Sequence, residues 1–319
     1  MLESLFMTDG LRKQMDNKIT VVGDHITPKV SVCIVTYNQE KYIRECLSSI
    51  FRQTTNFDFE VIVGDDCSTD STRSIVQEFA NLYPNKLKVL LHTKNVGAVE
   101  NYFATHELAQ GKYIAHMDGD DYALPGKLQK QADFLDEHVI FNIVWHRVNY
   151  QFVNGRQAPD LIRYEKIREG YSKSDLIKFT FLANHSTKMY RATQRQFCGR
   201  SKTTLDYLLN IQHLQNGRAA YVSQEILGVY RYGLGISSDS NLKFRKYLID
   251  GLLNISKQGI DERIAVNCAA FALMLADIKN LNNTLIMISR LWINTISLRA
   301  VFKYLGFIQQ RRMYVVPKK

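Results

Sequence analysis

The sequence predicts an α/β protein with a mainly parallel, Rossmann-like sheet flanked by helices, followed by a C-terminal helical extension. Short apolar runs alternate with amphipathic segments through the first half of the chain, and acidic residues follow several of these runs directly. From Asp261 onward the pattern is helical. With 319 residues, 45% of them hydrophobic, the chain can bury a sizeable core.

The four predicted strands of the first half share runs of aliphatic residues. We expect them at residues 29–36, 59–64, 87–91 and 112–117. Helices are expected at residues 40–52, after a cap at Ser68 or Asp70, and at residues 97–109. Strand followed by helix therefore recurs along the chain, as in a parallel sheet.

The segment at residues 118–121, Asp-Gly-Asp-Asp, is the most informative feature of the sequence. It follows an apolar run, which places its carboxylates at the edge of the sheet where ligands bind in open α/β folds. Carboxylates so close together repel one another unless a divalent cation neutralises them, and their oxygens suit Mg²⁺ or Mn²⁺. An ordinary turn is the alternative. An EF-hand is not supported, because the twelfth position from Asp118 is Gln129. We therefore expect a metal-bound phosphate as the ligand.

Polar side chains also follow the first two strands. Thr36, Tyr37 and Asn38 follow one strand, and Asp65 and Asp66 follow the next. Because the carboxyl ends of parallel strands meet at one edge, these residues should converge with the acidic segment. Either aspartate could instead stabilise a helix N-terminus, and Tyr37 could either pack or stack on a base. Neither G-x-G-x-x-G nor G-x-x-x-x-G-K-[ST] occurs, so hydride transfer and NTP hydrolysis on those scaffolds are not expected.

Four segments together resemble the family 2 glycosyltransferases with a GT-A fold. They are residues 30–38 (VSVCIVTYN), 63–70 (VGDDCSTD), 95–97 (NVG) and 113–121 (YIAHMDGDD), in this order within residues 28–138. The resemblance implies an inverting, metal-dependent transfer of a sugar from a nucleotide-sugar donor, usually a UDP-sugar. We expect the product to be a surface polysaccharide or a similar glycan.

The resemblance also implies roles for individual residues. Asp66 would hydrogen-bond the uracil, Tyr37 would lie near that base, and Asp118 would contact the ribose or a metal-bound water. Asp120 would be the direct ligand of Mn²⁺ or Mg²⁺, with Asp121 assisting. The residues expected to bind the nucleotide are Thr36, Tyr37, Asn38, Asp65, Asp66, Asn95 and Asp118.

An inverting transfer needs a base that takes the proton from the acceptor hydroxyl. Asp206 is our candidate, because it begins a predicted amphipathic helix that is followed by a Tyr-Arg pair at residues 230–231, as in the family's acceptor-side segment. Leu205 and Tyr207 depart from the family's usual neighbours of this acid. The alternative is that Asp206 only caps its helix.

Three further residues are candidates for contacts with the diphosphate or the acceptor: Asp121, His185 and Arg231. His185 equally fits a packed histidine. The Gly- and Ser-containing segment at residues 233–240 fits either a flap over the donor or a linker.

We divide the chain into four parts. These are an N-terminal extension (1–27), a nucleotide-sugar-binding half of the GT-A domain (28–138), an acceptor-binding half (139–240) and a basic amphipathic helical region (241–319). Five widely spaced cysteines without a C-x-x-C pair favour a reducing compartment and argue against a zinc site.

The formal net charge of +10 could suggest nucleic acid binding, but the basic residues form no stripe interleaved with aromatic residues in the first half of the chain and gather towards its C-terminal end. The C-terminal helices, which carry Trp292, Phe302, Tyr304 and Phe307, could lie on an anionic membrane, pack on the catalytic domain or form a homodimer contact. No uncharged apolar run is long enough to span a bilayer, and no export signal is recognised. We expect a cytoplasmic enzyme, peripheral on the inner face of the membrane, that acts on a glycan or lipid-linked glycan acceptor.

Two other classes of function stay open. A nucleotidyltransferase would normally carry a Gly-rich basic loop after the first strand, where this chain has Tyr-Asn-Gln-Glu at residues 37–40. A non-catalytic nucleotide- or sugar-binding module would be favoured if Asp206 lay far from the anomeric carbon of the donor.

Overall fold

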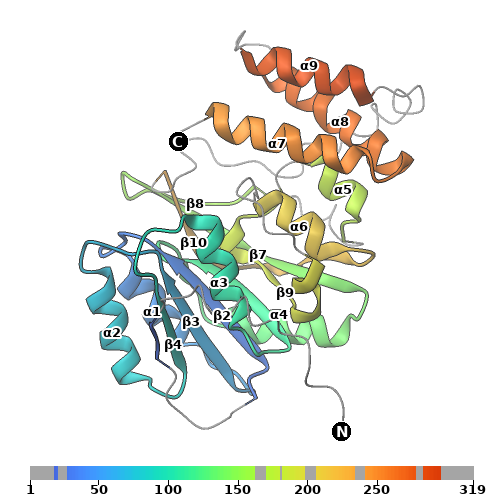
Figure 1. Cartoon of the computed structure of the whole chain (residues 1–319). Coiled ribbons are helices and arrows are strands. Elements are labelled where there is room, and N and C mark those ends of the chain that lie inside the picture. The colour runs from blue at the N-terminus through green and yellow to red at the C-terminus, as the bar shows by residue number, and fades with distance from the viewer. Residues whose placement is uncertain are drawn as a thin grey trace, which may run out of the picture.

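The fold is built on a mixed sheet that runs through most of the chain (Figure 1). The structure is a computed structural model that describes residues 18–20, 27–161, 170–179, 182–197, 206–233, 241–277 and 283–295. In these residues the strand order is β1-β4-β3-β2-β5-β9-β7-β10-β6, with β8 paired to β7. The strands are β1 (Lys18–Thr20), β2 (Val30–Thr36), β3 (Phe59–Asp65), β4 (Leu87–Leu91), β5 (Tyr113–Asp118), β6 (Tyr122–Ala123), β7 (Phe141–Phe152), β8 (Gln157–Pro159), β9 (Met189–Arg191) and β10 (Arg218–Tyr232).

Helices cover both faces of this sheet. They are α1 (Ile43–Phe51), α2 (Thr72–Leu82), α3 (Ala98–Glu107), α4 (Lys127–Glu137), α5 (Lys173–Lys178), α6 (Asp206–Leu214), α7 (Asn241–Ser256), α8 (Ile260–Asp277) and α9 (Asn283–Thr295), with short 3₁₀ turns η2 (His185–Thr187) and η3 (Ala192–Phe197). The cap position of α2 is Ser71 rather than Ser68 or Asp70, but the Asp70 carboxylate, one residue earlier, accepts a hydrogen bond from the Thr72 amide at 2.9 Å.

The four predicted strands form the parallel part of the sheet, in the order β4-β3-β2-β5. Successive residues of β2 alternate between two cores: Val32 and Ile34 pack in a cluster with residues of α1, α2 and α4, and Cys33 packs in a cluster on the opposite face. A strand that is buried on both faces needs apolar residues at almost every position. This requirement explains the uninterrupted aliphatic runs in the sequence.

The second half of the sheet combines both strand directions. The short strand β9 pairs antiparallel with both β5 and β7, whereas β10 runs parallel to β7 along most of its length. The Tyr-Arg pair at residues 230–231 lies near the end of β10, whose pairing with β7 has an irregularity between Tyr221 and Ile226. The parallel strands are therefore confirmed, and antiparallel strands extend the sheet beyond them.

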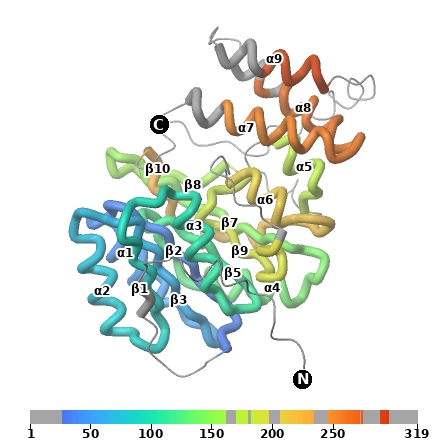
Figure 2. Tube along the Cα trace, viewed as in Figure 1, coloured from blue at the N-terminus to red at the C-terminus, as the bar shows by residue number. Residues whose placement is uncertain are grey.

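The C-terminal helices α7, α8 and α9 stack as a layer beyond α5 and α6 (Figures 1 and 2). Leu248 and Leu252 of α7 belong to the same buried cluster as Trp145 of β7, so this region shares a core with the sheet. No helix within the described residues is both long enough and apolar enough to cross a membrane. Residues 1–17, 234–240 and 296–319 lie outside the described residues, and with them the N-terminal segment, the proposed flap and three aromatic residues of the predicted membrane-binding region.

We expect Gly64→Ala to destabilise the fold. Gly64 lies in β3 beneath α3, where its carbonyl accepts a hydrogen bond from Asn101 Nδ2 at 2.9 Å. A Cβ atom at this position would lie 1.9 Å from Thr105 Oγ1, so α3 would have to move. Overpacking of this kind lowers the free energy of unfolding by about 1–3 kcal/mol, which urea unfolding can measure. In the control Gly259→Ala the new Cβ meets only the end of the flexible Glu262 side chain, and an unchanged midpoint is expected. Equal midpoints for Gly64→Ala and wild type would contradict the tight packing of α3.

Candidate active site

The carboxyl ends of three parallel strands bring the predicted residues to one edge of the sheet. In the register of the sheet, Thr36 at the end of β2 pairs with Asp65 of β3, and Val35 pairs with Asp118 of β5. The segments that follow these strands must therefore lie next to one another. The convergence predicted from the sequence is what the structure shows.

Asp66 lies at the base of a loop cradle beside this edge. Its carboxylate accepts hydrogen bonds from the amides of Val96 at 2.6 Å and Gly97 at 3.0 Å, and Asn95 Nδ2 donates to the Asp66 carbonyl at 3.2 Å. Gly97 directly precedes α3, so Asp66 also binds the N-terminus of that helix. Because a carboxylate has about four acceptor positions, Asp66 retains the capacity to accept one more donor, such as a nucleobase N–H.

Asp65 supports the same loop from inside the protein. It is fully buried, and its Oδ2 atom accepts hydrogen bonds from Arg73 Nε at 2.6 Å and from the Ser68 amide at 3.1 Å. Arg73 also donates to the carbonyl of His92. These contacts give Asp65 an internal role in holding the loop after β3.

The loop after β2 presents Tyr37 and fixes Asn38. The Tyr37 side chain is 44% exposed, so it does not pack in the core. Asn38 adopts a left-handed backbone conformation (φ +52°), and its Oδ1 atom accepts a hydrogen bond from the Thr69 amide at 2.8 Å. The Asn38 amide donates to Ser68 Oγ at 2.9 Å. Asn38 thus connects the loops that follow β2 and β3.

Ser186 organises the acidic segment. Its hydroxyl accepts a hydrogen bond from the Asp118 amide at 3.0 Å and lies within hydrogen-bond distance of the carboxylates of Asp118 and Asp121. The second oxygen of Asp121 accepts a hydrogen bond from the Arg231 amide at 2.8 Å. Among the described residues, no side chain donates to the carboxylate of Asp120, which is therefore the acid left open to a ligand.

The electrostatics of the acidic segment fit a divalent cation. Burial raises the pKa of all three acids; the charge of Asp118 adds to the effect at Asp120, and the charges of Asp120 and Asp118 add to it at Asp121. The pKa of Asp120 rises to about 6. A cation held by these oxygens would remove the repulsion, and hard oxygen ligands are those that Mg²⁺ and Mn²⁺ prefer.

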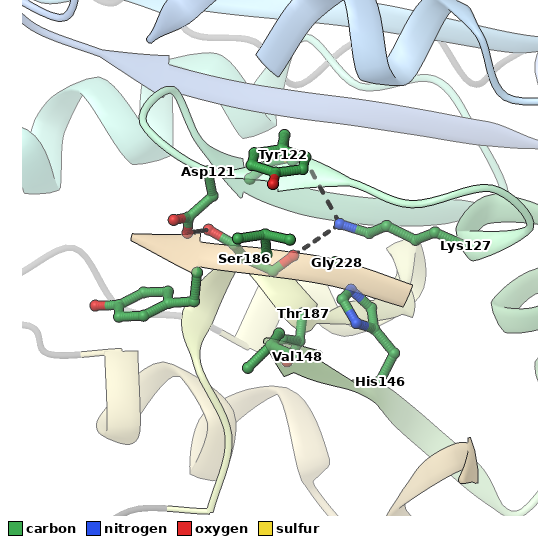
Figure 3. A pocket seen from close by; sticks show the side chains of 11 residues that line it. Asp121, Tyr122, Lys127, His146, Val148, Ser186, Thr187 and Gly228 are labelled. Atoms are coloured by element: carbon green, nitrogen blue, oxygen red, sulfur yellow. Dashed lines mark hydrogen bonds between the residues drawn. The ribbon is translucent and has the colours of Figure 1, made fainter. Parts of the chain in front are cut away.

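Lys127 lies behind the acidic segment, beside a cavity about the size of one water molecule (Figure 3). Its Nζ atom is buried and donates to the Ser186 carbonyl at 2.7 Å. Burial lowers the pKa of Lys127 to about 8, although the nearby Asp121 opposes this shift. Ser186 therefore links the carboxylate of Asp121 to the amine of Lys127.

Arg231 holds the acidic segment from the side of β10. Its guanidinium donates to the Asp120 carbonyl and to the carboxylate of Glu45. The guanidinium carbon lies 4.9 Å from the ring centroid of Tyr42 and 5.0 Å from that of Tyr122. Arg231 would have to leave Glu45 to bind a phosphate, so its diphosphate contact stays a prediction.

Asp206 and His185, predicted separately, form a hydrogen-bonded pair. His185 Nδ1 lies 3.1 Å from Asp206 Oδ1 at the start of α6. Loss of hydration acts to raise the pKa of Asp206, but the proximity of His185 and its hydrogen bond outweigh this and hold that pKa well below its usual range. Asp206 is therefore ionised at neutral pH, as a proton acceptor must be.

His116 connects this pair to the acidic segment. Its ring centroid lies 3.9 Å from that of His185, and its Nε2 atom lies 3.2 Å from Asp118 Oδ1. Its Nδ1 atom lies 2.9 Å from Nε2 of His106. Burial lowers the pKa of both His106 and His116 well below the usual value, so both rings are neutral at neutral pH.

Sequence analysis missed the roles of three residues of this site. His116 was visible as the one polar residue in an apolar strand, and Ser186 was visible only as the neighbour of His185. Lys127 gave no signal, because a lysine in an amphipathic helix is normally exposed.

Comparisons with known proteins agree with this architecture. A family model described as "Glycosyl transferase family 2" matches residues 31–194. An uncharacterized protein of Mycobacterium tuberculosis is 30% identical over 219 residues, which cover 68% of this chain and 63% of the relative. The poly(ribitol-phosphate) beta-N-acetylglucosaminyltransferase TarS of Staphylococcus aureus is 35% identical over 166 residues, 52% of this chain and 28% of TarS.

A solved structure shows the same fold. The crystal structure of residues 1–349 of S. aureus TarS in complex with UDP-GlcNAc has a TM-score of 0.63 and 24% sequence identity, and covers 89% of this chain and 82% of that chain. This likeness confirms the predicted fold, including the helical C-terminal region. The matched regions span less than two thirds of the full-length mycobacterial and staphylococcal relatives.

We expect Asp120→Asn to stabilise the metal-free protein at high pH. The folded pKa of about 6 exceeds the value near 4 of an unfolded chain, so ionisation of Asp120 lowers stability as pH rises from 4 through 6. Asparagine should raise the free energy of unfolding by up to about 3 kcal/mol at pH 8 and about half as much at pH 5. Urea unfolding in EDTA at the two pH values measures this difference.

The matched control is Asp58→Asn, which changes an exposed acid remote from the acidic segment and should leave unfolding unaltered at both pH values. A gain for Asp120→Asn that is the same at pH 5 and pH 8 would show that ionisation of the buried Asp120 carboxyl is not its cause.

Proposed function

Because the chain belongs to glycosyltransferase family 2, and is therefore a glycosyltransferase with the GT-A fold, we propose that it transfers a sugar from a UDP-sugar to a surface glycan or lipid-linked glycan with inversion at the anomeric carbon. The observation that carries the proposal is the meeting, at one sheet edge, of the Asp66 cradle, the acidic segment and Asp206. These features supply a nucleoside pocket, a diphosphate site and a base.

The nucleoside is assigned to the loops after β2 and β3. Asp66 is held by two backbone amides and keeps acceptor capacity for the N–H group of uracil. The exposed ring of Tyr37 lies at the same strand ends and can stack on the base. Asn38 and Asp65 keep the two loops in place through internal hydrogen bonds.

The diphosphate is assigned to the acidic segment. A divalent cation bound at Asp120 would stabilise, as a Lewis acid, the negative charge that develops on the leaving diphosphate. Ser186 and the backbone amide of Arg231 fix Asp118 and Asp121 on either side of Asp120. No side chain among the described residues donates to the carboxylate of Asp120, so in this proposal it is available to bind the cation.

The acceptor hydroxyl is assigned to Asp206. In an inverting transfer the acceptor oxygen attacks the anomeric carbon on the face opposite the leaving diphosphate, and its proton passes to the base. His185 keeps Asp206 ionised and fixes its orientation through the hydrogen bond at 3.1 Å. One oxygen of Asp206 remains to take the proton.

A polymeric acceptor is supported by relatives rather than by the site itself. TarS is named as an enzyme that transfers N-acetylglucosamine to poly(ribitol-phosphate), and it shares 35% identity with just over half of this chain. The C-terminal helices, which in this proposal also approach a membrane or a second subunit, would place such an acceptor near α6. The parts of the chain proposed for donor and acceptor binding are residues 28–138 and 139–240.

We expect UDP to bind more tightly than GDP or CDP, and to need Mn²⁺ for its full affinity. In isothermal titration calorimetry Asp120→Ala should weaken UDP binding at least tenfold with Mn²⁺ present and little without it, because the side chain acts through the cation. Asp58→Asn should behave as wild type. If none of the three nucleotides binds with or without metal, the donor assignment fails.

We expect Asp206→Asn to abolish transfer while leaving donor affinity unchanged. Loss of a general base lowers kcat by about 10²–10⁴-fold. UDP release from a panel of UDP-sugars, measured with glycan acceptors and with water alone, gives kcat, and calorimetry gives the UDP affinity. The control Glu225→Gln changes an exposed acid of β10 and should retain activity. Full activity of Asp206→Asn would move the role of base to another residue.

A further inference from the structure

A second set of metal-ligating side chains adjoins the acidic segment. His116, Asp118 and His185 each offer one ligand atom, and these atoms all lie within 4.8 Å of one another. We propose that these three residues bind a divalent first-row transition-metal ion, through two imidazole nitrogens and one carboxylate, at a site separate from the carboxylate of Asp120. The proposal does not depend on the identity of the donor or the acceptor.

The free nitrogen of His185 is the first observation that points to a ligand. The side chain is only 7% exposed, and its Nδ1 atom is bonded to Asp206. Its Nε2 atom is buried and has no hydrogen-bond partner among the described residues. An unsatisfied polar atom in the interior is unfavourable unless something binds it. With Nδ1–H donating to a carboxylate, Nε2 is the nitrogen that carries the lone pair.

The partners of the two histidines are those of metal ligands. A ligating histidine usually donates its other ring N–H to a carboxylate or another acceptor, which fixes the ring and raises its basicity. Asp206 serves His185 in this way, and His106 serves His116, with Nδ1 of His116 lying 2.9 Å from Nε2 of His106. Nδ1 of His106 continues the chain to the Tyr190 hydroxyl at 2.8 Å.

The chain of hydrogen bonds permits metal binding at His116 without any net gain or loss of protons. Without metal, the carboxylate of Asp118 can only accept a hydrogen bond, so His116 must carry its proton on Nε2 and donate it to Asp118. Nδ1 of His116 then accepts from Nε2 of His106, and Nδ1 of His106 accepts from the Tyr190 hydroxyl. With a metal on His116 Nε2, the proton moves to Nδ1 and the order of donors in the chain reverses. Both imidazoles remain neutral, which is the form that binds metals.

The spacing of the three residues suits a single ion after a small adjustment. Two ligands of one tetrahedral ion, each about 2.0–2.2 Å from it, lie roughly 3.5 Å apart. The three ligand atoms lie within 4.8 Å of one another, so they must approach by up to about 1.3 Å, which side-chain rotation can supply. Two imidazoles favour Co²⁺, Ni²⁺ or Zn²⁺ over Mg²⁺ or Ca²⁺, and Mn²⁺ is the weakest-binding ion of the same first-row series. The site would therefore give this enzyme a preference for transition metals.

Electron spin echo spectroscopy of Mn²⁺ added to the EDTA-treated full-length protein tests the proposal. We expect nitrogen modulation from directly bound imidazole in the wild type. The modulation should be weakened in His185→Ala and in His116→Ala, whereas Asp120→Ala should retain it in full. The control His138→Ala removes an exposed histidine at the end of α4 and should leave the spectrum unchanged. Circular dichroism verifies that each variant is folded.

A second variant tests the proposal even if His116→Ala does not fold. Asp206→Ala leaves all three ligands in place but removes the partner of His185, and should weaken Mn²⁺ binding by about 10–100-fold in a titration followed by electron paramagnetic resonance. A wild-type spectrum without nitrogen modulation, undiminished nitrogen modulation in His185→Ala, or no bound Mn²⁺ would each overturn the proposal. UDP binding by such a sample would leave the proposed function standing. Nitrogen modulation without binding of any nucleotide would overturn only the proposed function.

Discussion

Three carboxylates within four residues, two of them buried and one partly buried, are the constraint on which the rest of this site depends. Asp118, Asp120 and Asp121 repel one another in a place with little water, and the protein compensates from three directions. Ser186 bonds two of them, the amide of Arg231 bonds Asp121, and Lys127 supplies a positive charge from behind. Among the described residues, only Asp120 has no side chain of another residue, and no amide of another residue, bonded to its carboxylate. The compensation is therefore incomplete at the one acid where a cation is expected.

These compensating residues come from the half of the chain that follows the acidic segment. Ser186 lies in η2, between β8 and β9, and Arg231 lies near the end of β10. Because β9 inserts between β5 and β7, the proposed acceptor half is joined to the donor half within one sheet. A change in the acceptor half can thus alter the donor site through Ser186 or Arg231, without any contact with the donor itself. The boundary that we place at residue 138 divides functions rather than separate folding units.

The sequence predicted the parts of this structure that depend on local pattern. Strands β2 to β5 and the helices between them follow from aliphatic runs and helical periodicity, and strand polarity then brings Asp66 and Asp118 together. The insertion of β9 depends on pairing between residues far apart in the chain, for which three residues give no local signal. The family resemblance singled out Asp66 for the base, but the local sequence pattern did not show that Asp65 would bond Arg73 inside the protein. The pairing of His185 with Asp206 needed the fold.

The pairing of Asp206 with His185 has a consequence for catalysis. A carboxylate whose pKa is held low is ionised at neutral pH, but it is also a weak base, so it contributes less driving force to proton transfer. In the proposed reaction most of the barrier must then be lowered at the other end, where negative charge develops on the leaving diphosphate. The buried charged groups of Asp120, Asp121 and Lys127 lie at this proposed diphosphate end. His116 joins the two ends, since its ring packs against that of His185 and its Nε2 atom lies 3.2 Å from Asp118 Oδ1, so a change in charge at the proposed diphosphate site should alter the environment of Asp206.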